Sequence, residues 1–199
     1  MGKTISLGEN MSVLKDLLEG NQRFVSGTNE FPRIDRERRL EGLNGQKPKA
    51  IVIGCADSRV PPEYILDQGI GDLFVLRVAG NIVDDAIIGS IEYAVDNLET
   101  PLLMVLSHTN CGAVGAAIHT SVEDAPGSIS SLIEAIKPAV EKVKDLEGDL
   151  QDNATKENAR LVAESLKRQG QIISQAYVNN KLEIVAAYYD IETGIVTAL

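Results

Sequence analysis

Short apolar runs that alternate with helical stretches are the feature of this sequence that most constrains its fold. From Ala50 onward, strands are predicted where the runs are short, apolar and largely β-branched. These predicted strands cover residues 50–54, 73–78 and 102–107, and the helices that separate or follow them cover 62–68, 84–98 and 112–119. Alternation of this kind predicts parallel pairing with right-handed crossovers. We therefore expect an α/β fold with a mostly parallel central sheet and flanking helices.

The segments on either side of this region extend the prediction to the whole chain. An amphipathic helix is expected at 12–26, with Ser12 as its cap, and a highly charged helix at 33–43. Longer helices are expected at 128–146 and 154–178, the second broken near Gly170. The alternating tail predicts strands at 182–189 and 195–199, joined as a C-terminal hairpin. At this length we expect a single domain over 1–199, with an N-terminal helical arm (1–45) and an α/β core (46–199).

Charge and apolar patterning exclude some functional classes. The net charge of −10 argues against a nucleic-acid partner, which requires a basic surface. The longest apolar runs are too short to span a membrane, and the N-terminus lacks the pattern of a signal peptide. We therefore expect a cytoplasmic protein. The chain has two cysteines, and in a reducing compartment these favour a metal site or a catalytic role.

Both cysteines and one of the two histidines directly follow predicted strands. Cys55 comes after the run 50–54, and His108-Thr-Asn-Cys111 comes after the run 102–107. Carboxyl ends of parallel strands meet at one edge of a sheet, where open α/β folds bind ligands. Zinc prefers thiolate and imidazole ligands, and catalytic zinc sites commonly keep three protein ligands and one open position. The pattern predicts a zinc site formed by Cys55, His108 and Cys111.

Asp57 and Arg59 follow the first cysteine closely, and two arrangements are open. Asp57 is either a fourth metal ligand or the partner of the Arg59 guanidinium. A bidentate pair with Arg59 would leave the fourth position to water and would fix Asp57 as a hydrogen-bond acceptor beside it. Zinc lowers the pKa of bound water, so an open site is suited to hydration or hydrolysis.

Other interpretations of the cysteines remain open on these residues alone. They could be inert core residues, or ligands of a structural zinc ion with Asp57 completing the tetrahedron. Cys55 or Cys111 could be a nucleophile activated by His108. A reversible disulfide between the two cysteines is a further alternative, but it leaves Asp57 and Arg59 unexplained.

The segments Cys55-Ala-Asp-Ser-Arg59 and His108-Thr-Asn-Cys111 resemble the hallmark motifs of the β-class carbonic anhydrases, Cys-x-Asp-Ser-Arg and His-x-x-Cys. Three more segments are similar to the bacterial branch of that family: Gly20-Asn-Gln-Arg-Phe24, Arg77-Val-Ala-Gly-Asn81 and Ser90-Ile-Glu-Tyr-Ala-Val95. The resemblance runs from about residue 12 to the end and is weakest over 120–155.

The resemblance implies a zinc lyase that reversibly hydrates CO2 to bicarbonate and a proton by attack of zinc-bound hydroxide. It implies one Zn²⁺ per chain, with Cys55, His108 and Cys111 as ligands. Asp57 and Arg59 match the catalytic dyad of the family, whose Asp in some members binds zinc instead.

Substrate binding and assembly also follow from the resemblance. It assigns Gln46, Phe74 and Tyr93 to the CO2 pocket, partly across a subunit interface, although Phe74 and Tyr93 also suit a plain core. A homodimer or homotetramer is implied, with the N-terminal helices covering a neighbouring subunit. The alternative on the same scaffold is hydrolysis of COS or CS2.

Overall fold

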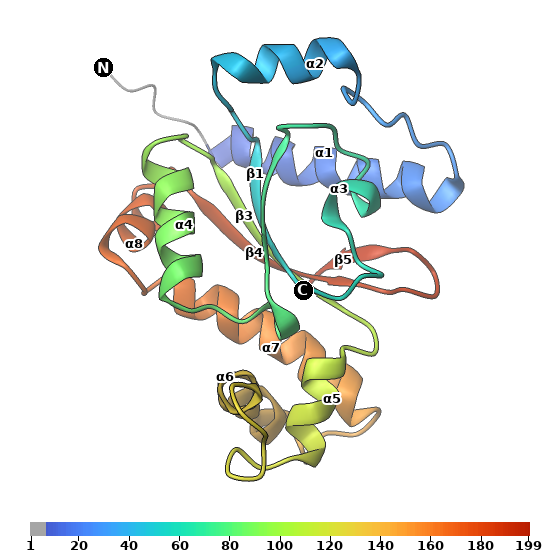
Figure 1. Ribbon diagram of the computed structural model, residues 1–199, viewed down its shortest axis with the longest axis vertical. Helices are drawn as coiled ribbons and strands as arrows, with labels where there is room; N and C mark the ends of the chain where they lie inside the picture. The colour runs from blue at the N-terminus through green and yellow to red at the C-terminus, as the bar shows by residue number, and fades with distance from the viewer. Residues whose placement is uncertain (1–6) are drawn as a thin grey trace.

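A five-stranded sheet forms the centre of the molecule (Figure 1). The computed structural model of the protein describes residues 7–199. In spatial order the strands are β2 (Leu73–Arg77), β1 (Ala50–Gly54), β3 (Leu102–His108), β4 (Glu183–Tyr189) and β5 (Val196–Ala198). The first four are parallel, and β5 pairs antiparallel with β4. This arrangement confirms the predicted parallel sheet and the C-terminal hairpin.

Helices cover both faces of the sheet and its carboxyl edge. They are α1 (Leu7–Ser26), α2 (Arg36–Glu41), α3 (Pro62–Ile65), α4 (Asp85–Asp96), α5 (Gly112–His119), α6 (Ile129–Val143), α7 (Leu150–Leu166) and α8 (Gln171–Val178). Short 3-10 turns occupy Gly42–Asn44 and Ala79–Asn81. Gly170 has a φ of +69° and separates α7 from α8, as the sequence predicted. Among the described residues, no helix is both long and apolar enough to cross a membrane.

The two faces of the sheet hold separate cores because successive strand residues point to opposite sides. Val52 and Met104 face α1 and α3, and the core on this side continues to α5 and α6 at the carboxyl edge. Ile51 and Leu103 face α4, α7 and α8. Strands β1 and β3 are buried along their whole length, which explains their uninterrupted apolar sequence.

Several predicted helix boundaries were wrong, and the helix expected from residue 154 begins at Leu150. The first helix begins at Leu7 rather than after Ser12, so Ser12 is not its cap. The second begins at Arg36, because the Asp35 side chain caps it by accepting a hydrogen bond from the Arg38 N–H at 2.8 Å. The third ends at Ile65, two residues before Asp67 takes a left-handed conformation (φ +49°). Residues 1–6 of the predicted arm lie outside the described residues, and the division into an arm and a core stays a prediction.

Helix α1 packs on the sheet of its own chain. Leu17 is fully buried in the core. The Asn21 amide donates to the carbonyls of Ile65 and Gly194, and its oxygen accepts the N–H of Val196. The described contacts of this helix therefore join α3 to the terminal hairpin.

Gly20 permits this close packing. A Cβ at Gly20 would lie 2.0 Å from the Leu66 carbonyl oxygen, a backbone atom that cannot move away cheaply. Gly20→Ala is expected to lower the free energy of unfolding by about 1–3 kcal/mol, the usual cost of overpacking. Gly89→Ala is the matched control, because its Cβ would meet no atom within 4 Å in helix α4. This control should gain about 0.5–1 kcal/mol from helix propensity. Urea unfolding of both variants measures the difference, and equal effects would contradict the packing argument.

Asp67, which follows α3, holds the end of helix α1 and the loop after it. Its fully buried carboxylate accepts hydrogen bonds from Arg23 Nε at 2.6 Å and from the N–H groups of Glu30 and Phe31 at 3.1 and 3.0 Å. Burial alone raises the pKa of Asp67, but these hydrogen bonds outweigh it and hold the pKa below its ordinary value.

We therefore expect the free energy of unfolding to fall at acidic pH as Asp67 becomes protonated. Its contribution is complete above the unfolded pKa of about 3.9 and is lost as the pH falls towards the lower folded value. Asp67→Asn keeps a residue that tolerates the left-handed conformation, and should cost about 1.5–3 kcal/mol at pH 7. The difference in the free energy of unfolding between wild type and variant, measured by urea titration, should decrease below pH 4. If this difference stays constant down to pH 2.5, the ionised Asp67 carboxylate is not its cause.

Candidate metal centre

The pairing of β1 with β3 brings the two cysteine-bearing segments together. Gly54, the last residue of β1, lies opposite Leu106 of β3. Cys55 follows β1 directly, and His108 is the last residue of β3. Cys111 precedes helix α5 as its N-cap, after a tight turn in which Asn110 takes a φ of +54°. All three side chains therefore meet at the carboxyl edge of the sheet, as predicted.

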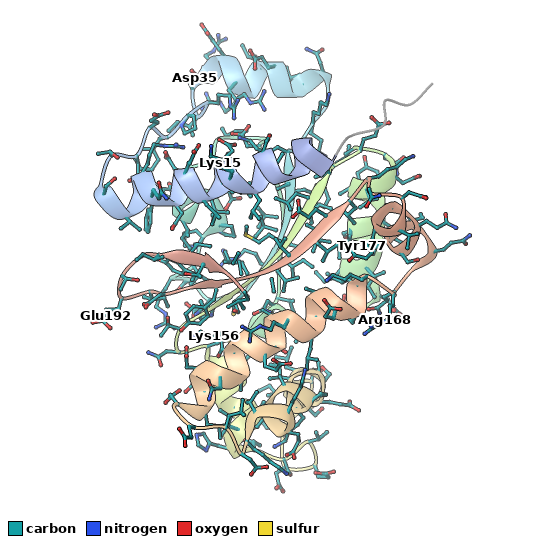
Figure 2. The ribbon with its side chains drawn as sticks, turned by 180° about the vertical axis from the view of Figure 1, so that it is seen from behind. Lys15, Asp35, Lys156, Arg168, Tyr177 and Glu192 are labelled. Atoms are coloured by element: carbon teal, nitrogen blue, oxygen red, sulfur yellow. The ribbon has the colours of Figure 1, made fainter. Side chains whose placement is uncertain are left out.

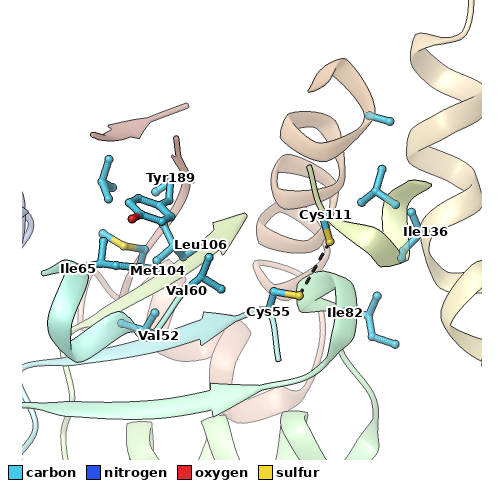
Figure 3. Close-up of a cluster of buried hydrophobic side chains, with 14 of the residues drawn as sticks. Val52, Cys55, Val60, Ile65, Ile82, Met104, Leu106, Cys111, Ile136 and Tyr189 are labelled. Carbon is cyan, nitrogen blue, oxygen red and sulfur yellow. Dashed lines mark hydrogen bonds between the residues drawn. The ribbon is translucent and has the colours of Figure 1, made fainter. Parts of the chain in front are cut away.

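The donor atoms of these three residues form one buried cluster. The Cys55 and Cys111 sulfurs and a His108 ring nitrogen all lie within 4.8 Å of one another. The side chains are 4%, 1% and 1% exposed, respectively. Figure 3 shows the two sulfurs facing each other, with Ile82 and Ile136 nearby on the apolar wall. The cysteines are free, and their sulfurs are 3.9 Å apart.

The pKa values of the two thiols shift in opposite directions. The hydrogen bond from Cys111, together with contacts from His108 and the Gly80 N–H at 3.3 Å, lowers the pKa of Cys55. The same hydrogen bond, and burial, raise the pKa of Cys111. A bound cation would allow both sulfurs to be thiolates.

Asp57 is paired with Arg59 at the rim of the cluster. Arg59 Nε and Nη2 donate to the two carboxylate oxygens at 2.9 and 2.7 Å, and the Arg59 backbone N–H donates at 2.9 Å. The Arg59 guanidinium holds the pKa of Asp57 well below its usual range. Asp57 Oδ2 also lies 4.0 Å from His108 Nε2. Of the two arrangements left open by the sequence, this structure contains the arginine pair.

Two further residues hold this centre, and sequence reasoning gave neither a role. Arg77, at the end of β2, donates to the carbonyls of Cys55 at 2.9 Å and Asp57 at 2.5 Å. Gly80 has a φ of +70°, and a Cβ there would lie 2.6 Å from the Ile136 side chain. Both belong to a segment that had been noted only for its resemblance to the bacterial enzymes. The glycine was the one available signal, because an N–H aimed at sulfur needs a close backbone approach.

The cluster fits a zinc ion in its chemistry. Among the described residues, His108 Nε2 is a buried nitrogen with no hydrogen-bond partner. A buried polar atom is costly to leave unsatisfied, and this one lies beside two buried sulfurs. One imidazole and two thiolates form a donor set that zinc prefers.

The three predicted substrate residues lie away from this cluster within one chain. Gln46 is exposed and precedes β1, whereas Cys55 follows it, so the two occupy opposite ends of the strand. Phe74 and Tyr93 contact each other with ring centroids 6.4 Å apart. Phe74 packs with the α4-side core, on the opposite face from the core that contains Cys55. Their assignment to the substrate pocket stays a prediction that requires a second copy of the chain.

Known proteins are similar to this chain in sequence and in fold. The family model described as carbonic anhydrase matches residues 50–196. Carbonic anhydrase 2 of Mycobacterium tuberculosis is 38% identical over 183 residues, which cover 90% of this chain and 88% of that protein.

Solved structures of β-carbonic anhydrases have a similar fold. A tetrameric β-carbonic anhydrase from Sordaria macrospora superposes with a TM-score of 0.74 at 26% identity, covering 81% of this chain and 85% of its own. The β-carbonic anhydrase of Coccomyxa, solved in complex with acetazolamide, has a TM-score of 0.72 at 26% identity, with 94% and 86% covered.

Proposed function

The chain belongs to the β class of the carbonic anhydrase family, and on that premise we propose that it reversibly hydrates CO2 to bicarbonate and a proton with one zinc ion per chain. The single observation that carries the proposal is the buried cluster of Cys55, His108 and Cys111, with its unpartnered imidazole nitrogen. The cytoplasmic location stays a prediction.

The proposed ligands are the two cysteine sulfurs and His108 Nε2. Bound zinc supplies Lewis acidity that lowers the pKa of a coordinated water, the general role of zinc in carbonic anhydrases. Asp57 is already engaged by Arg59, which supports a set of three protein ligands without it.

We assign Asp57 the role of orienting the reacting water. The lowered pKa keeps its carboxylate ionised through the neutral range, so it acts only as an acceptor. The oxygen nearest the ligands, Oδ2, is available to take a hydrogen bond from that water. Arg59 prevents the carboxylate from rotating, and Arg77 holds the main chain beneath it. This fixed geometry reduces the reorganisation needed in the transition state.

The substrate pocket is proposed to form between two subunits. Tyr93 is 49% exposed, Gln46 is exposed, and β2, which carries Phe74, is an edge strand of the sheet. These residues are therefore free to contact the metal centre of another copy. The Sordaria macrospora enzymes are tetrameric, which supports an assembly of this chain as a homodimer or homotetramer.

The metal requirement is tested with the two histidines of the chain. The purified protein should hold one zinc per chain, and dipicolinate treatment should abolish CO2 hydration until zinc is restored. His108→Gln should lose zinc and activity. His119→Gln, exposed at the end of α5, should retain both. Hydration by metal-free protein would contradict the proposal, and turnover of COS or CS2 without CO2 would favour hydrolysis on the same scaffold.

The role of Arg59 is tested by a change that preserves charge. Arg59→Lys removes the bidentate contact with Asp57 while keeping a cation. We expect zinc content to be unchanged and kcat/KM for CO2 to fall about 100-fold, as for a misplaced catalytic group. Arg168→Lys, an exposed change near the end of α7, is the matched control and should behave as wild type. Full activity in Arg59→Lys would remove the dyad from the mechanism.

A further inference from the structure

The His108 ring is oriented by its neighbour in sequence. His108 Nδ1 lies 2.9 Å from the Thr109 carbonyl oxygen, and Nε2 is the unpartnered nitrogen. For Nε2 to bind a cation, Nδ1 must carry the ring proton and donate it to that carbonyl. The placement of the Thr109 peptide therefore sets both the tautomer and the direction of the ring.

Strand β4 and the residues after it hold Thr109 in place. The Thr109 N–H donates to the Tyr189 carbonyl at 3.0 Å, and Ile191 N donates to Thr109 Oγ1 at 3.3 Å. The Tyr188 hydroxyl lies 3.1 Å from the same Oγ1. The threonine hydroxyl is thus the point where the ligand turn meets a side chain of β4.

Tyr188 is in turn held by helix α7. Its hydroxyl contacts Asp152 Oδ1 at 2.5 Å. Lys156 Nζ lies 2.6 Å from Asp152 Oδ2 and 4.5 Å above the tyrosine ring. Figure 2 shows Lys156 on this helix, which packs against β3 and β4. Burial and the Asp152 carboxylate raise the pKa of Tyr188 to about 12, so the phenol keeps its proton as a donor.

Gln151, the residue before Asp152, contacts the Cys111 end of the His108–Cys111 turn. Gln151 Nε2 donates to the Cys111 carbonyl at 3.0 Å. Gln151 and Asp152 are both in the first turn of α7. Two adjacent residues of one helix therefore hold the His108–Cys111 turn at both of its ends.

We propose that the first turn of α7 is a positioning element of the metal centre, acting on Cys111 through Gln151 and on His108 through Asp152, Tyr188 and Thr109. The inference rests on the proposed zinc binding. None of these four residues belongs to the ligand cluster. They act by keeping the imidazole and one sulfur at a constant separation and direction, which makes release of the ion slower.

Tyr188→Phe is the sharpest single test. It keeps the ring and its contact with Lys156, and removes only the hydroxyl between Thr109 and Asp152. The rate of zinc transfer from the holoenzyme to excess chelator should rise about 10-fold or more, the usual scale for residues that orient metal ligands. Gln151→Ala should have a similar effect through Cys111.

Two controls separate positioning from general packing. Tyr189→Phe removes a neighbouring hydroxyl that makes no hydrogen bond to a described residue, and should release zinc at the wild-type rate. Thr109→Ser keeps the hydroxyl and should also release slowly, whereas Thr109→Val should release as fast as Tyr188→Phe. Cobalt-substituted Tyr188→Phe should show altered visible absorption bands, because these report ligand geometry and not overall stability.

The outcomes divide cleanly. Wild-type release rates and unchanged cobalt bands in both Tyr188→Phe and Gln151→Ala would overturn the inference, whatever their unfolding midpoints. A wild-type protein that binds no zinc would overturn it together with the proposed function. A wild-type protein that binds zinc without hydrating CO2 would defeat only the proposed function, because accelerated release in the variants would still support positioning.

Discussion

The parallel pairing of β1 with β3 is the constraint on which the rest of the structure depends. Both strands are entirely buried, and their successive residues belong to different cores on the two faces of the sheet. A shift of the register by one residue would exchange the faces, so the pairing of Gly54 with Leu106 is strongly specified. The meeting of Cys55 with the His108–Cys111 turn is a direct consequence of this pairing.

The metal centre has a buried part, the three donor side chains, and a solvent-exposed part, the Asp57–Arg59 pair. The three donor side chains are almost inaccessible, which penalises net charge and favours neutralisation by a cation. Asp57 and Arg59 have side-chain exposures of 18% and 51%, so their ion pair lies where solvent reaches it. Solvent can thus reach the carboxylate side in one chain, while the sulfur side remains apolar.

Sequence reasoning was most successful where a pattern is local. The strands at 50–54 and 102–107 were predicted within one residue, because each is a short apolar run ended by polar residues. The cluster of two cysteines and a histidine followed from motif spacing and from strands that end at the same edge. The start of α2 was missed because it depends on a capping side chain, Asp35, inside a run of charged residues.

The residues that hold the ligand turn could not be predicted, because their role depends on contacts between segments that are distant in the sequence. Gln151 and Tyr188 are ordinary residues in sequence, and only the packing of α7 and β4 brings them to the ligand turn. Gln151 and Asp152 also lie in the region where the family resemblance was weakest. Gln46, Phe74 and Tyr93 were assigned by resemblance alone, and one chain does not bring them to the cluster.

The long separation between Thr109 and its partners has a consequence for biosynthesis. Thr109 is 79 residues from Tyr188 and 80 from Tyr189. At roughly 5–20 residues per second, the ribosome needs on the order of 4–16 s to make that interval. During this time the nascent chain already contains both thiols but lacks the strand that completes their surroundings. The surroundings of the two thiols are therefore completed only late in the synthesis of the chain, after β4 has been made.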